Sequence, residues 1–129
     1  VEPVMAKLAS IELLIDRLGI FPPAGPPRII WAGSSDGAPE LSALAGALSS
    51  ALCRVGFADE QRTFTPHITI AKIKRLKICP LHEAIAKLPL DPIKTTFSQV
   101  GLFSSAPGPA GSIYTVLSRF SLRARTPNV

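Results

Sequence analysis

A single amphipathic helix, predicted from Ala38 to Val55, constrains the fold more than any other part of the sequence. Its apolar residues recur at three- and four-residue steps and line one helical face: Leu41, Leu44, Leu48, Leu52 and Val55. Pro39 suits the first turn of a helix, and Gly56 suits the position just after its end. The sequence therefore predicts one long helix with shorter elements around it.

The segments before this helix have the composition of β-strands. Arg28–Ala32 is short, β-rich and bounded by two prolines and by Gly33-Ser34-Ser35, so we expect a strand there. Ser10–Ile20 alternates as a strand does but also fits a helical spacing. We favour a strand, which ends in the turn region Gly19–Pro27.

The segments after the helix predict further strands and a second, short helix. His67–Lys74 alternates apolar and polar residues, as a strand with one buried face requires, and Ile68 and Ile70 form its apolar side. The loop Ser104–Ser112 is rich in proline and glycine, and we expect it to lack regular structure. The remaining elements are a helix at 80–87 and strands at 95–103 and 113–122. This order predicts an α+β fold with an antiparallel or mixed sheet and helices on one face.

The composition describes one folded domain, which we place at residues 1–122 of the 129, with a flexible tail at 123–129. Its 47% hydrophobic and 18% charged residues exclude a disordered chain. No apolar run has the length of a membrane span, and the first residues do not form a secretory signal. Two cysteines, Cys53 and Cys79, exclude a disulfide framework or a zinc site, and we expect a reducing, cytoplasmic location.

The charge balance suits an anionic partner. Fourteen Lys and Arg residues stand against nine Asp and Glu residues, which gives a net charge of +5. RNA or a nucleotide fits this balance, and so does a basic surface without any partner. The densest group of positive charges comprises Lys72, Lys74, Arg75 and Lys77.

His67 and Thr69 form the pair of residues best suited to chemistry. Residues two apart in a strand point to the same side, so both project from the face opposite Ile68 and Ile70. An imidazole can move a proton near neutral pH, and a hydroxyl can donate a hydrogen bond to a phosphoryl oxygen. The same alternation places Lys72 on the other side, as a rim charge that attracts RNA or as a solvated strand end. A structural interpretation, two polar residues on a solvated sheet face, stays open.

The run FTPHITIAK at Phe64–Lys72 resembles the second His-x-Thr-x signature of the two-histidine phosphoesterases. It is most similar to the branch of RNA 2′,3′-cyclic phosphodiesterases, also called 2′-5′ RNA ligases. Flanking motifs extend this resemblance over about residues 6–122. They are GIFP at Gly19–Pro22, PRIIW at Pro27–Trp31, GLFSS at Gly101–Ser105 and IYTVL at Ile113–Leu117.

The resemblance implies a two-lobed fold around a cleft, with one His-x-Thr motif on each lobe and this chain as its larger C-terminal part. It implies an enzyme that opens 2′,3′-cyclic phosphate ends of RNA, or small cyclic nucleotides, to 2′-phosphates without a metal or a cofactor. We expect this chain to be a monomer. Some members join tRNA halves through a 2′-5′ linkage. His67 and Thr69 match the catalytic motif residue by residue. Ser105, Lys72 and Tyr114 are the candidate substrate contacts. Tyr114 either stacks on a base or simply packs, and packing is the more common role of such a residue.

Departures from the family pattern limit the functional prediction. The first His-x-Thr motif is expected upstream of Val1, and residues 1–66 contain no histidine. The other histidine, His82, has no threonine two residues on, and we interpret it as an exposed helix residue. Ser104 and Ala106 stand where relatives often carry an arginine and an acidic residue. The alternative function is therefore an RNA- or nucleotide-binding module without turnover.

Overall fold

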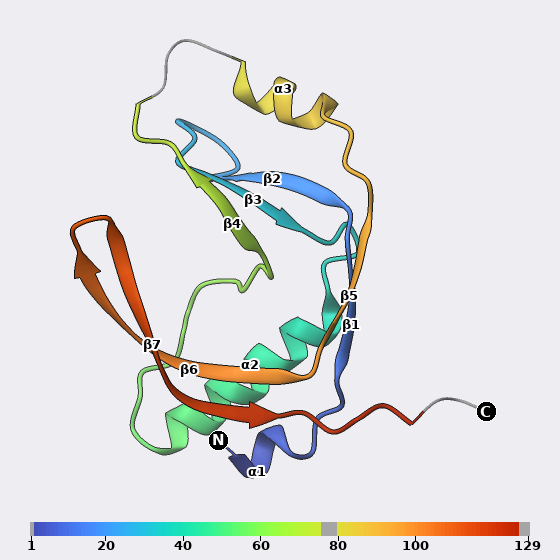
Figure 1. The fold of residues 1–129 in the computed structure, drawn as a ribbon, viewed down its shortest axis with the longest axis vertical. Coiled ribbons are helices and arrows are strands. Elements are labelled where there is room, and N and C mark those ends of the chain that lie inside the picture. The colour runs from blue at the N-terminus through green and yellow to red at the C-terminus, as the bar shows by residue number, and fades with distance from the viewer. Residues whose placement is uncertain (1, 76–79, 127–129) are drawn as a thin grey trace. The chain divides into compact units, whose positions relative to one another are not determined.

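The computed structural model describes residues 2–75 and 80–126, and Figure 1 shows the elements that they form. The helices are α1 (Glu2–Met5), α2 (Pro39–Arg54) and α3 (Leu81–Lys87). The strands are β1 (Ile11–Ile15), β2 (Arg17–Phe21), β3 (Ile29–Gly33), β4 (Ile68–Lys72), β5 (Ile93–Phe97), β6 (Gln99–Gly108) and β7 (Gly111–Ser121). β2 with β3, β3 with β4, and β6 with β7 pair antiparallel, and the predicted α+β class is confirmed. No helix among these residues combines the length and the apolar character that a membrane crossing requires.

The chain forms two compact units from segments that alternate along the sequence. Unit 1 comprises Val1–Ile11, Gly46–Glu60 and Thr96–Val129, and unit 2 comprises Glu12–Ala45 and Gln61–Thr95. The single domain at 1–122 stays a prediction.

The predicted tail at 123–129 begins with a residue that is bonded to the N-terminal segment. Arg123 donates its N–H to the Leu8 carbonyl, and its own carbonyl accepts the Ser10 N–H, both at 2.8 Å. Residues 127–129 of this tail lie outside the described residues.

Unit 2 contains the three-stranded sheet β2-β3-β4, in which β3 is central (Figure 1). β2 and β3 pair in regular register, with Gly19 opposite Trp31. The register of β3 and β4 shifts once. Thr69 pairs with Trp31 and Ala71 pairs with Ile30, so Ile70 between them is an extra residue without a partner on β3. Such a β-bulge changes which side of the sheet the following residues face.

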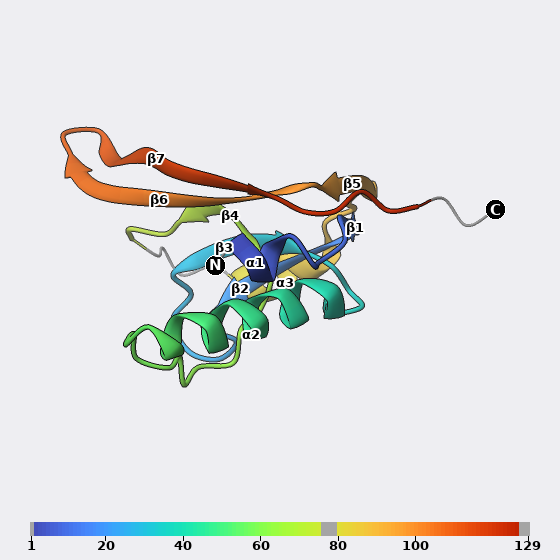
Figure 2. The same ribbon diagram turned by 90° about the horizontal axis from the view of Figure 1, so that it is seen from below.

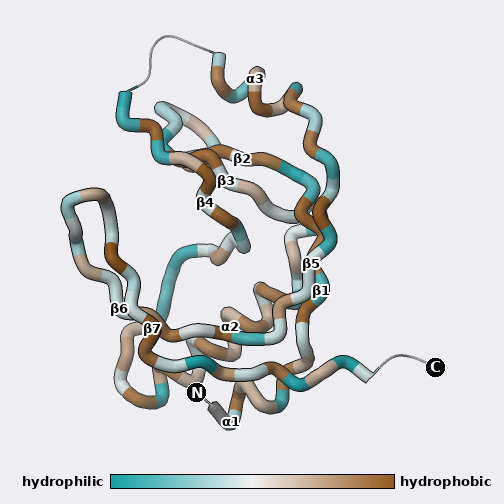
Figure 3. The backbone as a smooth tube through the Cα atoms, in the orientation of Figure 1, coloured by the Kyte–Doolittle hydropathy of each residue, from teal (hydrophilic) through white to brown (hydrophobic). Residues whose placement is uncertain are grey.

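β4 is exposed along its whole length, which corrects the prediction of a buried apolar face on this strand. Ile68 is 50% exposed and Ile70 is 58% exposed. The strand lies at one edge of the sheet, and α3 packs on β2, at the other edge. Figure 3 shows hydrophobic residues in β2, β3 and β4 alike. Alternation predicted the strand correctly and its burial wrongly, because burial depends on what packs against the strand.

The long helix is confirmed, and α2 begins and ends within one residue of the predicted positions. Near its start, the Asp36 carboxylate accepts hydrogen bonds from the Ser34 hydroxyl (2.6 Å) and the Ala38 N–H (2.8 Å). These two hydrogen bonds lower the pKa of Asp36. Gly56, at a φ of 98°, follows the helix in the left-handed region that terminates helices.

The segment predicted as one strand at Ser10–Ile20 is two strands, since β1 pairs with β5 and β2 pairs with β3. Asp16 separates them. Its carboxylate accepts hydrogen bonds from the Ser35 hydroxyl (2.5 Å) and the Ser35 N–H (2.7 Å), and both bonds lower the pKa of Asp16. This contact ties the start of β2 to the end of β3. The strand predicted at 95–103 is likewise divided between β5 and β6.

Unit 1 contains a long antiparallel hairpin, β6–β7, which Figure 2 shows as an extended ribbon. It corrects the prediction of an irregular loop at Ser104–Ser112, because the strands continue to Gly108 and start again at Gly111. Gly111 has a φ of 126°, which suits the tight turn between them. A two-stranded ribbon has a free edge on each side. Proline has no N–H to donate, so Pro107 is tolerated at a position where its nitrogen faces this free edge.

Candidate functional site

His67 lies directly before β4, and its side chain is exposed. Its Nδ1 is 2.6 Å from the carbonyl oxygen of Thr65. A carbonyl oxygen accepts hydrogen bonds and cannot donate them, so Nδ1 carries the hydrogen and Nε2 is left for proton transfer. The backbone two residues earlier thus orients the imidazole and selects its tautomer.

Two aromatic residues pack beside this imidazole. Phe21 contacts His67 edge-on, with ring centroids 4.9 Å apart and an interplanar angle of 89°. Trp31 lies 6.3 Å from the same ring and stacks on Phe21 at 5.2 Å. Aromatic contacts of this geometry restrict the orientation of a ring. The motifs GIFP, PRIIW and FTPHIT, which are far apart in the sequence, therefore meet around one histidine.

Trp31 occupies space that two glycines leave free. A Cβ built on its cross-strand partner, Gly19, would overlap three indole atoms, the farthest of them 2.7 Å away. A Cβ on Gly33 would lie 2.8 Å from another indole atom. The indole therefore spans both glycines, and Trp31 is only 6% exposed. Its Nε1 is buried without a hydrogen-bond partner among the described residues.

The β-bulge in β4 decides which side Lys72 faces. Cross-strand partners project to the same side of a sheet, so Thr69 shares the face of Trp31. Beyond the bulge, Lys72 pairs with Ile29, which lies two residues from Trp31 on β3 and shares its face. Lys72 thus lies on the Thr69 side of the sheet, whereas unbroken alternation predicts the opposite side. The predicted separation of Lys72 from the histidine face is wrong.

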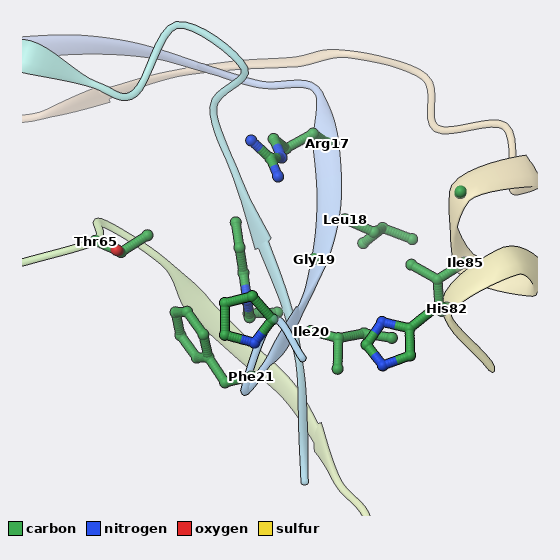
Figure 4. Close-up of a pocket in the computed structure, with 11 residues that line it drawn as sticks. Arg17, Leu18, Gly19, Ile20, Phe21, Thr65, His82 and Ile85 are labelled. Atoms are coloured by element: carbon green, nitrogen blue, oxygen red, sulfur yellow. The ribbon is translucent and has the colours of Figure 1, made fainter. Parts of the chain in front are cut away.

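Two open cavities adjoin the aromatic rings, with volumes of about 360 Å³ and about 200 Å³. Arg17, Trp31 and Thr65 line both of them. The Arg17 guanidinium lies over the Trp31 ring, with Cζ 5.2 Å from the ring centroid. In Figure 4, which shows the larger cavity, Arg17 and Thr65 lie on one side of β2, and His82 and Ile85 of α3 lie on the other. His82 is exposed, as interpreted from the sequence, and lines this cavity.

The two other predicted substrate contacts lie in unit 1. Ser105 on β6 is directly opposite Tyr114 on β7 in the register of the hairpin. Both side chains are exposed, Tyr114 by 66%. The structure thus pairs Ser105 with Tyr114 in unit 1 and places Thr69 and Lys72 on one face of the sheet in unit 2.

Arg17 and Thr65 belong to the site and were missed by sequence reasoning. Arg17 shares strand parity with Gly19 and Phe21, and this parity is the signal that would have placed it beside the aromatic rings. Thr65 acts through its backbone carbonyl, which no side-chain pattern reveals. Within residues 2–75 and 80–126, no group of three or more His, Cys, Asp and Glu side chains is placed to hold a metal ion.

The fold belongs to a class seen in solved structures. A protein of Thermus thermophilus matches with a TM-score of 0.71 at 23% identity, over 97% of this chain and 67% of that one. LigT of E. coli, solved in complex with 3′-AMP, matches with a TM-score of 0.69 at 23% identity, over 93% of this chain and 65% of LigT. At this level of identity the similarity shows the fold.

The family follows from the sequence comparison. The model of the 2′-5′ RNA ligase superfamily matches residues 1–109, and this chain belongs to that superfamily. The RNA 2′,3′-cyclic phosphodiesterase of Aquifex aeolicus is 33% identical over 123 residues, which cover 94% of this chain and 65% of the relative. That of Aeropyrum pernix is 36% identical over 96 residues, which cover 67% of this chain and 53% of the relative. The resemblance inferred from the motifs is confirmed, and the chain spans less than two thirds of the length of these relatives.

Proposed function

We propose that this chain acts in the metal-independent hydrolysis of 2′,3′-cyclic phosphate ends of RNA to 2′-phosphates. The observation that carries the proposal is the geometry of His67, an exposed imidazole whose Nδ1 is held by the Thr65 carbonyl, two residues from the hydroxyl of Thr69. The relatives that bear the name RNA 2′,3′-cyclic phosphodiesterase support it.

Opening a cyclic phosphate requires two proton transfers. A water oxygen forms a bond to phosphorus while the bond from phosphorus to O3′ breaks. One group takes a proton from the water, and another gives a proton to the departing O3′. Nε2 of His67 performs one of these transfers. The resemblance assigns the other to the histidine of a first His-x-Thr motif, which residues 1–66 do not contain.

Thr69 and Lys72 hold the phosphate in this proposal, because both lie on the Trp31 face of the sheet. The Thr69 hydroxyl donates to a phosphoryl oxygen. The Lys72 ammonium offsets the negative charge on the phosphoryl oxygens, and it does so as a point charge on a flexible stem. Ser105 and Tyr114 contact the rest of the RNA, the first through its hydroxyl and the second by stacking on a base.

The second candidate function is binding of RNA or a nucleotide without turnover. The net charge of +5 favours it, because a basic chain attracts an anionic partner whether or not a reaction follows. The phosphate contacts would be the same in both functions. Joining of RNA through a 2′-5′ linkage uses this site with a 5′-hydroxyl in place of the water. The monomeric state and the cytoplasmic location stay predictions.

The proposal is tested with an oligoribonucleotide that ends in a 2′,3′-cyclic phosphate. We expect hydrolysis by the full-length protein that EDTA does not change. His67→Ala should lower the rate by about 10²–10⁴-fold, the usual contribution of a positioned acid or base. Thr69→Val should lower it roughly tenfold, and Thr96→Val, the same change at an exposed position on β5, should leave it unchanged.

Loss of activity in EDTA, or full activity of His67→Ala, would refute the mechanism. An equal loss in His67→Ala and His82→Ala would contradict the assignment to His67 alone. Binding of the oligoribonucleotide without any hydrolysis by the wild-type protein would establish the binding module instead.

A further inference from the structure

Arg17 is a cation whose position the catalytic chemistry does not explain. Its side chain is exposed, yet its guanidinium rests on a buried indole and borders both cavities. Among residues 2–75 and 80–126 it makes no ion pair, and the carboxylate of neighbouring Asp16 is engaged by Ser35. The charge of Arg17 is therefore available to an anion from outside the chain.

Trp31 fixes the guanidinium in place. The indole is held by the two glycines below it and by the stacking contact with Phe21. A guanidinium that lies over an aromatic ring keeps the N–H groups at its edge free, and it is weakly hydrated compared with an ammonium. An anion that approaches this edge thus meets donors that are already oriented, so little conformational entropy is lost on binding.

The sheet register separates the backbone of Arg17 from that of His67. Arg17 pairs with Gly33 on β3, and Ala32 pairs with Ile68 on β4, so Gly33 lies level with His67. Arg17 and His67 are therefore in one row, two strands apart, which corresponds to about 10 Å between their backbones. This backbone spacing leaves room for two phosphates, one at His67 and one at the edge of the Arg17 guanidinium.

We propose that Arg17 on Trp31 is a subsite for a second phosphate of an RNA substrate, namely the phosphodiester that precedes the nucleotide with the cyclic end. The proposal rests on the proposed function and deepens it, because it makes the site selective for oligonucleotides over mononucleotides. The donors of a planar guanidinium match the two free oxygens of a phosphodiester in a bidentate contact. The cavities beside Arg17 accommodate the sugar and the base that this phosphodiester carries.

Three substrates test the subsite. A nucleoside 2′,3′-cyclic phosphate lacks the second phosphate, a dinucleotide with the same end contains it, and a dinucleotide with a methylphosphonate linkage contains a neutral form of it. Arg17→Ala should lower kcat/KM roughly tenfold for the normal dinucleotide and less than twofold for the other two substrates. Arg17→Lys should give a smaller loss, because it keeps the charge without the planar fork.

Arg54→Ala is the matched control, since Arg54 is exposed at the end of α2 and lines neither cavity. It should leave all three values of kcat/KM unchanged. An equal loss on all three substrates in Arg17→Ala would overturn the proposal, because Arg17 would then act on the reacting phosphate or on the fold. No loss on the normal dinucleotide, or the same loss on the methylphosphonate, would also overturn it.

A binding experiment distinguishes an error in the proposed subsite from an error in the proposed function. Trp31 is the one tryptophan of the chain, so its fluorescence reports directly on the guanidinium that covers it. If no substrate is hydrolysed, titration with a dinucleotide that ends in a 2′-phosphate still applies. The subsite then predicts a change in Trp31 emission and roughly tenfold weaker binding in Arg17→Ala. Equal binding by the wild type and Arg17→Ala would refute it.

Discussion

Replacement of Gly19 by alanine tests whether the position of Trp31 depends on the absence of a side chain opposite it. A Cβ at this position would overlap three indole atoms, and Trp31 is buried. Overpacking of this kind destabilises the folded protein by about 1–3 kcal/mol. Alanine also has less conformational freedom than glycine in the unfolded chain, and this difference stabilises the folded protein by about 0.4–1 kcal/mol. Because the overlap falls on rigid ring atoms, we expect Gly19→Ala to lower the free energy of unfolding by about 2 kcal/mol.

Gly46→Ala is the matched control. Gly46 is exposed within α2, and a Cβ there would meet nothing within 4 Å. Alanine in a helix interior is favoured over glycine, so this variant should raise the free energy of unfolding by about 0.5–1 kcal/mol. The same chemical change is therefore expected to have opposite signs at the two positions.

Urea unfolding, followed by circular dichroism and by the fluorescence of Trp31, measures both effects. The native emission should also change in Gly19→Ala, because the indole must leave its place over the glycines, and it should stay unchanged in Gly46→Ala. If Gly19→Ala is as stable as the wild type and its emission is the same, the packing argument for Trp31 is wrong.

Three further predictions concern the sheet and the hairpin. Lys72→Ala should lower kcat/KM for a cyclic phosphate end roughly tenfold, while Lys94→Ala, a loss of the same charge on β5, should have no effect; equal rates for the two variants would contradict the bulged register. The pKa of Asp16 lies below its usual 3.8 because of its bonds to Ser35, so its contribution to stability is present above that pH and is lost as the pH falls through the lowered value. Urea midpoints measured against pH should therefore fall less steeply in acid for Asp16→Asn than for the wild type, and parallel curves would refute this. Tyr114→Phe should keep RNA affinity and Tyr114→Ala should lose about 1–3 kcal/mol of it, as a stacked base requires, whereas equal affinities in a binding titration would exclude stacking.

The local pattern of the sequence was sufficient to predict the bounds of the long helix and the common side of His67 and Thr69. The leucine spacing before Gly56 placed α2 within one residue at each end. The side shared by His67 and Thr69 follows from alternation over three residues, a distance over which a strand keeps its period. Features of this kind depend on residues that are close together in the chain.

The position of Lys72 and the extent of the β6–β7 hairpin needed the structure. One unpaired residue, Ile70, reverses the side that Lys72 faces, and nothing within β4 itself signals it. The strands that continue through Ser105 are stabilised by partners on the opposite strand, although proline and glycine suggest a loop. Cross-strand pairing overrides local propensity, because each pair adds hydrogen bonds and contacts that an isolated segment lacks.

The sequence by itself determined the family motif and the chemical character of the site, because the imidazole and the hydroxyl are fixed by residue identity. Only the tertiary structure decided how that imidazole is oriented. The Thr65 carbonyl, Phe21 and Trp31 reach His67 from separate segments, and Arg17 approaches the same aromatic rings from β2. Contacts between such segments depend on the register of the sheet, which a one-residue shift alters, and so they cannot be obtained from spacing along the chain.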